Sequence, residues 1–135
     1  NLSERLNRSI TWLFDSRMDQ RLDAAFVKSA ISLEALLVLS STEPLTQSIS
    51  ERSAFLLSDS KEEREKVSYY IKQFYNTRSG IVHGSRKRFK QVNENLLDGI
   101  DRLIIIICIV LAYNIDLFYE ENKLNQKRRE KDPKI

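Results

Sequence analysis

The sequence predicts an all-α fold, a bundle of about five helices, and three observations support it. The 135 residues include only three glycines and two prolines, the residues that most often interrupt helices. Strong helix formers such as leucine, lysine, glutamate and arginine are plentiful. No segment shows a sustained alternation of apolar and polar residues, which is the pattern of a half-buried strand.

A chain of this length is expected to form one domain with its own core. We place the helical domain at residues 1–121 and expect residues 122–135, which are charged and have little to bury, to be a mobile tail. The sequence begins at Asn1 and shows no signal-peptide pattern, so we expect a C-terminal fragment of a larger cytoplasmic protein.

The first three helices are predicted from apolar spacing and turn residues. A short first helix contains apolar residues at helical spacing, and Ser16, three residues before Asp19, is expected to cap the second helix. The second helix should run over residues 17–40 and the third over residues 45–57, with Pro44 in its first turn.

Ser60 and Glu63 form a capping-box pattern that opens the fourth helix, and Gly84 is placed to cap its end. Arg78 falls on the apolar stripe of this helix, four residues after Phe74. A guanidinium on the core side needs a carboxylate or an anionic ligand. Glu34 of the second helix is the candidate carboxylate, since it lies among apolar residues and either has a cationic partner or faces water.

The last helix is predicted over residues 92–121, and its centre, LIIIICIVLA at residues 103–112, is apolar on every side. Such a helix is expected to be fully buried, and covering it should take a second subunit as well as its own bundle. The run is too short to cross a membrane. Cys108 has no partner cysteine, which excludes a disulfide and a cysteine zinc site.

Positive charge is concentrated around the single histidine. The net charge is +3, yet residues 67–93 hold six lysines or arginines and no acidic residue. Such a basic face predicts a polyanionic partner, although a solvated charged loop is the alternative. Four of these basic residues follow His83 within seven positions: Arg86, Lys87, Arg88 and Lys90.

Three segments of the chain carry a family resemblance. RSGIVHG at residues 78–84, preceded by SLEALL at residues 32–37 and ERSAFLL at residues 51–57, resembles the Apea-like branch of the HEPN domains. The resemblance covers about residues 12–118. It implies a helical bundle that usually dimerises and a metal-independent endoribonuclease with no cofactor, whose R-x4-6-H motif is here Arg78 and His83. It also implies toxin–antitoxin or antiviral defence roles, with an antitoxin or other domains of the parent protein as possible partners.

The chemistry of the motif agrees with RNA cleavage. RNA supplies its own nucleophile, so a histidine that transfers protons near neutral pH and an arginine that stabilises phosphoryl oxygens can suffice, leaving a 2′,3′-cyclic phosphate. Ser79 stands where the family more often has Asn, Asp or His, so a catalytically inactive module for dimerisation and nucleotide or nucleic-acid binding is the alternative. A plain helix end at RSGIVHG is a third interpretation. Asn76 and Ser85 are further polar candidates for the catalytic site. The four basic residues are candidate contacts to the RNA backbone. Tyr69, Tyr70 and Tyr75 are candidates for stacking on RNA bases or for the core.

A monomer holds only one histidine, whereas the reaction uses both a base and an acid. In a regular helix, five residues also place His83 about 140° around the axis from Arg78. Both difficulties ease in a two-fold dimer. We therefore expect a composite site at a homodimer interface.

Overall fold

The computed structural model describes residues 1–84, 94–114, 124 and 126–131, and all structural statements below refer to these ranges. The described part is helical and contains no strand, which confirms the all-α prediction. Residues 126–131 are helical and exposed. The boundary expected at residue 121 lies outside the described residues. The main helices are α1 (Leu2–Met18), α2 (Leu22–Leu37), α3 (Leu45–Leu57), α4 (Lys61–His83) and α6 (Glu94–Tyr113).

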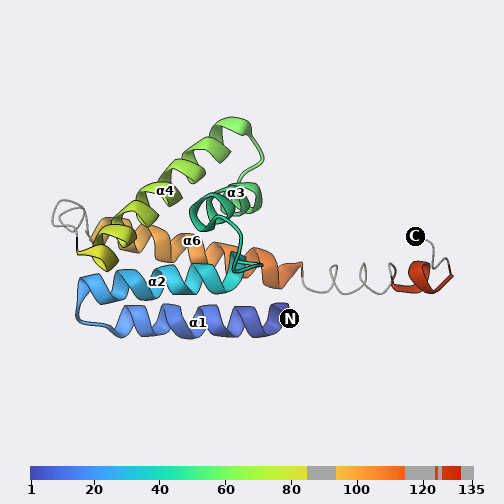
Figure 1. Ribbon diagram of the computed structural model, residues 1–135, viewed down its shortest axis with the longest axis horizontal. Coiled ribbons are helices and arrows are strands. Elements are labelled where there is room, and N and C mark those ends of the chain that lie inside the picture. The colour runs from blue at the N-terminus through green and yellow to red at the C-terminus, as the bar shows by residue number, and fades with distance from the viewer. Residues whose placement is uncertain (85–93, 115–123, 125, 132–135) are drawn as a thin grey trace.

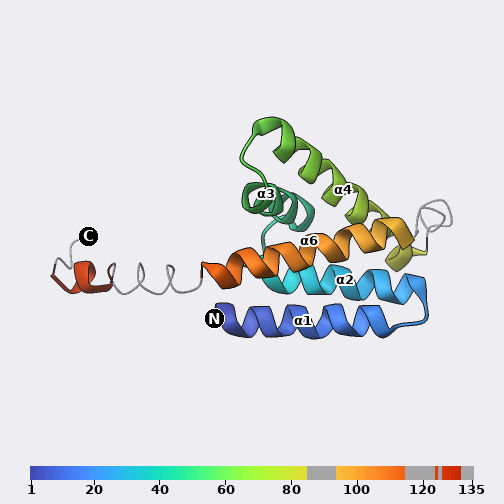
Figure 2. The same cartoon turned by 180° about the vertical axis from the view of Figure 1, so that it is seen from behind.

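Helix α2 lies at the centre of the bundle. As Figures 1 and 2 show, α1 runs antiparallel to α2 along one side, α3 and α4 lie on the other side, and α6 runs in the same direction as α2. The rings of Phe26 and Phe74 stack with centroids 4.5 Å apart and join α2 to α4. The fully buried aliphatic side chains around them are Leu33, Ile49, Ile71, Ile100, Ile104 and Ile107.

Two helix boundaries differ from the prediction. Helix α1 continues to Met18, so Ser16 is not a cap: its buried hydroxyl donates to the Ala25 carbonyl oxygen at 2.7 Å. Helix α2 begins only at Leu22, after Arg21. The capping pattern was misread because the serine satisfies its hydroxyl through a neighbouring helix, which local spacing does not reveal.

Helix α2 also ends earlier than predicted, at Leu37 and not at residue 40, whereas the predicted ends of α3 and α4 are confirmed. Helix α3 has the predicted bounds, although Pro44 is its N-cap and does not lie in the first turn. The Ser60 side chain accepts a hydrogen bond from the Glu63 amide at 3.2 Å. Gly84 ends α4 with φ of 70°, a left-handed conformation that glycine adopts without strain.

Buried hydroxyl groups hold α1, α2 and α6 together. Ser9 of α1 and Ser32 of α2 lie 2.9 Å apart, and Ser9 also contacts the thiol of Cys108. Ser29 donates to the buried Asp101 carboxylate of α6 at 2.6 Å. These contacts set the rotation of α6 about its own axis relative to α1.

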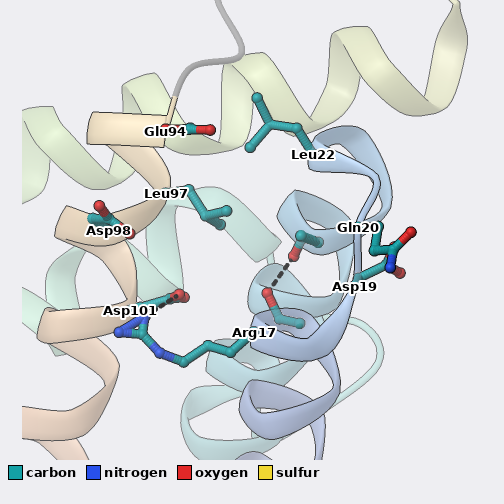
Figure 3. A pocket seen from close by; sticks show the side chains of 10 residues that line it. Arg17, Asp19, Gln20, Leu22, Glu94, Leu97, Asp98 and Asp101 are labelled. Carbon is teal, nitrogen blue, oxygen red and sulfur yellow. Dashed lines mark hydrogen bonds and ion pairs between the residues drawn. The ribbon is translucent and has the colours of Figure 1, made fainter.

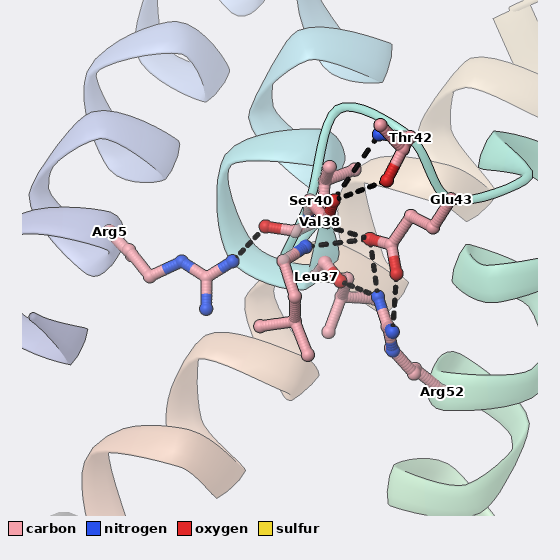
Figure 4. A network of polar contacts seen from close by, with 8 residues as sticks. Arg5, Leu37, Val38, Ser40, Thr42, Glu43 and Arg52 are labelled. Atoms are coloured by element: carbon pink, nitrogen blue, oxygen red, sulfur yellow. Dashed lines mark hydrogen bonds and ion pairs between the residues drawn. The ribbon is translucent and has the colours of Figure 1, made fainter.

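A second polar network closes the turn between α2 and α3 (Figure 4). Arg52 donates to both carboxylate oxygens of Glu43, at 2.8 and 2.6 Å, and to the Leu37 carbonyl oxygen at 2.6 Å. Arg5 of α1 donates to the Val38 carbonyl oxygen. These guanidinium groups satisfy carbonyl oxygens that the end of α2 leaves without helical partners.

The prediction that α6 is fully buried is wrong for a single chain. Ile100, Ile104 and Ile107 are buried against α2, but Ile105, Ile106 and Ile109 on the opposite side are exposed. The reason is geometric, since the described helices cover only one side of α6. Within the described residues, no helix combines the length and apolar composition needed to span a bilayer.

Candidate functional site

Helix α4 carries both residues of the predicted motif. Arg78 and His83 lie within one continuous helix, and the Gly84 amide donates to the Gly80 and Ile81 carbonyl oxygens at its end. The five-residue spacing therefore separates the two side chains by about 140°. Arg78 is half-buried on the side that meets α2, whereas His83 is exposed. One chain alone does not present both groups on one face.

Arg78 pairs with Glu34, as the sequence predicted. The Arg78 Nη2 and Glu34 Oε1 atoms are 3.5 Å apart, and the side chains are 27 % and 21 % exposed. Within the described residues, Glu34 Oε1 and Arg78 Nε are buried without a hydrogen-bond partner. The two groups thus attract by charge at a distance longer than a well-formed charge-assisted hydrogen bond.

Burial governs the charge state of this cluster. It raises the pKa of Glu34, and the attraction of Arg78 and a hydrogen bond from Tyr75 only partly oppose that rise. The pKa of Tyr75 is also raised, first by burial and then by the nearby Glu34 carboxylate. Tyr75 is a core residue, because its side chain is buried. Its hydroxyl lies 3.5 Å from the Ala30 carbonyl oxygen.

The three candidate stacking tyrosines occupy different environments. Tyr75 is buried, and Tyr70 is half-buried with its hydroxyl donating to the Leu96 carbonyl oxygen at 3.2 Å. Tyr69 is exposed, and its hydroxyl accepts a hydrogen bond from Gln73 at 2.8 Å. Of these three rings, only that of Tyr69 is open enough to stack on a base.

The other predicted site residues are placed only in part. Asn76 is exposed on α4, and Ser79 is half-buried one residue after Arg78. Ser85, Arg86, Lys87, Arg88 and Lys90 lie outside the described residues, so the predicted basic face stays a prediction. Among the described residues, no three His, Cys, Asp or Glu side chains are grouped so that they could hold a metal ion.

An acidic cavity that sequence reasoning missed lies beside the start of α6 (Figure 3). Its volume is about 310 Å³, and residues of α1, α2 and α6 line it. Arg17 pairs with Asp101 at 3.4 Å and Lys28 pairs with Asp19 at 2.8 Å, which offsets part of the negative charge. Its acidic residues are Asp19, Glu94, Asp98 and Asp101. The last three follow one another at helical spacing on α6 and so could have signalled one acidic face, whereas only the fold brings Asp19 beside them.

The fold and site together define an all-α bundle with a charge-paired arginine and an exposed histidine on one helix. Comparisons of the chain with protein-family models, with curated proteins and with solved structures gave no match. The case for a function therefore comes from the residues and their geometry.

Proposed function

We propose that this protein is a metal-independent endoribonuclease domain with a composite site at a homodimer interface. The observation that carries the proposal is the exposed His83 at the carboxyl end of α4, five residues after an arginine whose guanidinium is only loosely paired. In sequence, four basic residues follow within seven positions and supply charge for an RNA backbone.

The reaction needs two proton transfers. One His83 imidazole takes the proton of the ribose 2′-hydroxyl as its oxygen attacks phosphorus. The bond from phosphorus to the 5′-oxygen breaks, and the imidazole of the second copy donates a proton to that oxygen. The products are a 2′,3′-cyclic phosphate and a 5′-hydroxyl.

Arg78 would stabilise the negative charge that develops on the phosphoryl oxygens. To do so it must exchange Glu34 for phosphate. The 3.5 Å separation and the unpartnered Nε favour this exchange, because little hydrogen bonding is lost when the pair opens. The proposed setting is a cytoplasmic toxin–antitoxin or phage-defence protein with RNA as its substrate.

The pair of Arg78 with Glu34 also favours a second candidate. If the arginine serves only to neutralise a half-buried carboxylate, the domain is a catalytically inactive module that dimerises and binds nucleotides or nucleic acid. The two candidates differ in whether RNA is cut or only bound.

A cleavage assay with single-stranded RNA in EDTA tests the proposal. We expect cleavage with a cyclic-phosphate product, and we expect His83→Ala to reduce its rate by about 10²- to 10⁴-fold while circular dichroism stays unchanged. Glu65→Gln, an exposed change near the other end of the same helix, is the matched control. Adding an excess of His83→Ala chains to wild-type protein should lower the activity below that of the wild-type protein alone, because each mixed dimer keeps only one of the two imidazoles that the reaction uses.

Three outcomes argue against the nuclease. Cleavage that His83→Ala leaves intact would point to a contaminant. Salt-sensitive RNA binding without cleavage would favour the inactive module, and neither activity would favour a plain helical interaction domain.

A further inference from the structure

An apolar cavity lies at the end of the bundle remote from His83. Its volume is about 660 Å³, and residues at the start of α1, the end of α2, α3 and the end of α6 line it. The carboxyl end of α4 lies beside the opposite end of α6 (Figure 1). Leu111 of the cavity follows Glu94, the first residue of α6, by 17 residues, which is roughly 25 Å along the axis. The cavity is therefore separate from the candidate nuclease site.

The apolar walls of this cavity are aliphatic apart from one ring. Leu36 and Leu37 at the end of α2 are 2 % and 4 % exposed and form its inner wall, whereas Leu39 and Phe55 at its rim are 67 % and 71 % exposed. The other apolar lining residues are Leu2, Leu56 and Leu111. A volume between about 300 and 1,000 Å³ with mostly apolar walls is typical of small-molecule sites. Leucine side chains of this kind suit a flexible alkyl chain better than a planar ring system.

Most of the charge around the cavity is already engaged. The polar lining residues are Asn1, Arg5, Glu51 and Arg52. Arg52 donates to both carboxylate oxygens of Glu43 and to the Leu37 carbonyl oxygen. Glu51 is exposed on α3, and the side chain of Gln47 donates to its carboxylate at 3.0 Å. Arg5 is the lining residue whose charge these contacts leave unmatched.

Arg5 is a half-buried guanidinium without an anionic partner among the described residues. One terminal nitrogen donates to the Val38 carbonyl oxygen, and Figure 4 shows the second without a contact to the other residues drawn. None of the ion pairs between described residues involves Arg5. A guanidinium has five N–H donors and forms its strongest hydrogen bonds with a carboxylate, which accepts two of them in parallel.

We propose that this cavity binds a linear aliphatic monocarboxylate, with its carboxylate on Arg5 and its alkyl chain against the leucine side chains. A single negative charge fits, because Arg52 is already paired with Glu43 and Arg5 supplies one positive charge. Glu51 opposes a second negative charge on the ligand. It lies on α3, which is on the other side of α2 from α1 (Figures 1 and 2), so a carboxylate held at Arg5 stays away from it.

Isothermal titration calorimetry of the full chain with decanoate tests the proposal. Decan-1-ol and decyltrimethylammonium have the same chain length and serve as neutral and cationic probes. We expect decanoate to bind about tenfold or more tightly than decan-1-ol, because hydrogen bonds to charged groups are stronger than neutral ones, and the cation to bind most weakly. Octanoate should bind about tenfold more weakly than decanoate, since two fewer methylene groups are buried. Equal affinities for decanoate and decan-1-ol, or no binding of either, would overturn the assignment.

Two matched substitutions test the role of Arg5. Arg5→Met keeps an apolar stem and removes the charge, so decanoate should lose about tenfold or more in affinity while decan-1-ol keeps its own. Arg102→Met is the control, because Arg102 is exposed on α6 outside the cavity lining and its loss changes the net charge equally. Unchanged decanoate affinity in Arg5→Met, or an equal loss in Arg102→Met, would contradict a site at Arg5.

A third substitution tests the cavity without changing its charge. Leu111→Trp fills part of the space, so both decanoate and decan-1-ol should bind more weakly while circular dichroism stays unchanged. This variant decides the assignment if Arg5→Met binds neither probe. Wild-type affinity for decanoate in folded Leu111→Trp would overturn it. Amide NMR of the wild-type protein should show decanoate shifts at Leu37, Val38 and Leu111, and shifts confined to other residues would also reject the cavity.

Discussion

Arg78 Nη2 on α4 lies 3.5 Å from Glu34 Oε1 on α2, and this contact joins the candidate catalytic arginine to the central helix. The pair was expected because each residue interrupts an apolar stripe of its own helix. The distance between the two side chains is long for a hydrogen bond, and Glu34 Oε1 and Arg78 Nε are buried without hydrogen-bond partners. The pair therefore compensates charge more than it satisfies hydrogen bonds.

Removing Arg78 should destabilise the fold mainly when Glu34 is ionised. Arg78→Ala is expected to lower the free energy of unfolding by about 1–3 kcal/mol at pH 7, because the half-buried carboxylate loses its cation. Burial raises the pKa of Glu34 in the folded protein above 4.5, its value in the unfolded chain. The protonated carboxyl therefore contributes its full stability below pH 4.5, and this contribution is lost as the pH rises through the folded pKa. The cost of Arg78→Ala should therefore shrink at pH 4, as measured by urea denaturation. Glu34→Gln combined with Arg78→Ala should recover part of the loss, and an equal cost at both pH values would contradict the charge argument.

Asp101 should give stability the same dependence on pH. Burial raises the pKa of Asp101 and the charge of nearby Asp98 adds to the rise, while the Ser29 hydrogen bond and the charge of Arg17 oppose it. Stability from its protonated form is present below about pH 3.8 and is lost as pH rises through the folded pKa. Wild-type protein should thus lose stability relative to Asp101→Asn between about pH 4 and pH 7. Asp15→Asn, an exposed change on α1, should shift stability by no more than about 0.5 kcal/mol.

Glu43 should act in the opposite direction. Hydrogen bonds from Arg52 lower its pKa to about 2, so the stability that its ionised form contributes is present above about pH 4.5 and is lost as pH falls toward 2. Glu43→Gln should consequently lose less stability between pH 4.5 and pH 2 than wild type, as measured by thermal unfolding. Glu62→Gln, which removes an exposed pair with Lys66, serves as the control and should behave like wild type.

Gly99 and Tyr70 should be energetically coupled. A Cβ atom at Gly99 would lie 2.0 Å from the Tyr70 hydroxyl oxygen, so Gly99→Ala must displace the ring that hydrogen-bonds the Leu96 carbonyl oxygen. We expect Gly99→Ala to cost about 1–3 kcal/mol. Tyr70→Phe should cost less in the Gly99→Ala background than in wild type, as a double-mutant cycle by urea denaturation would show. Additive costs would mean that the ring moves aside freely.

Gly84→Ala has open space around its added methyl group, so its cost should instead come from the left-handed backbone.

Local patterns were reliable where the deciding interaction is local. The Ser60 capping box, the Gly84 cap and the bounds of α3 follow from residues within a few positions of one another. Ser16 shows the limit: its spacing to Asp19 imitates a cap, but a neighbouring helix takes up its hydroxyl.

The candidate site divides in the same way. The pairing of Arg78 with Glu34 could be inferred because a charge on an apolar stripe demands an opposite charge. The burial of Tyr75 and the exposure of Tyr69 could not, because both lie on one helix and only the position of α2 distinguishes them. For the acidic cavity, the helical spacing of Glu94, Asp98 and Asp101 could have indicated one acidic face of α6, but not that Asp19 lies beside it.

The sequence by itself determined that the chain is helical and where several helices end, and it made Glu34 the candidate partner of Arg78, because these depend on backbone propensity and on the cost of burying charge. Only the tertiary structure decided that Ile105, Ile106 and Ile109 of α6 are exposed. The apolar centre of this helix predicts burial on every side, and only the placement of the other described helices shows that they cover one side of it.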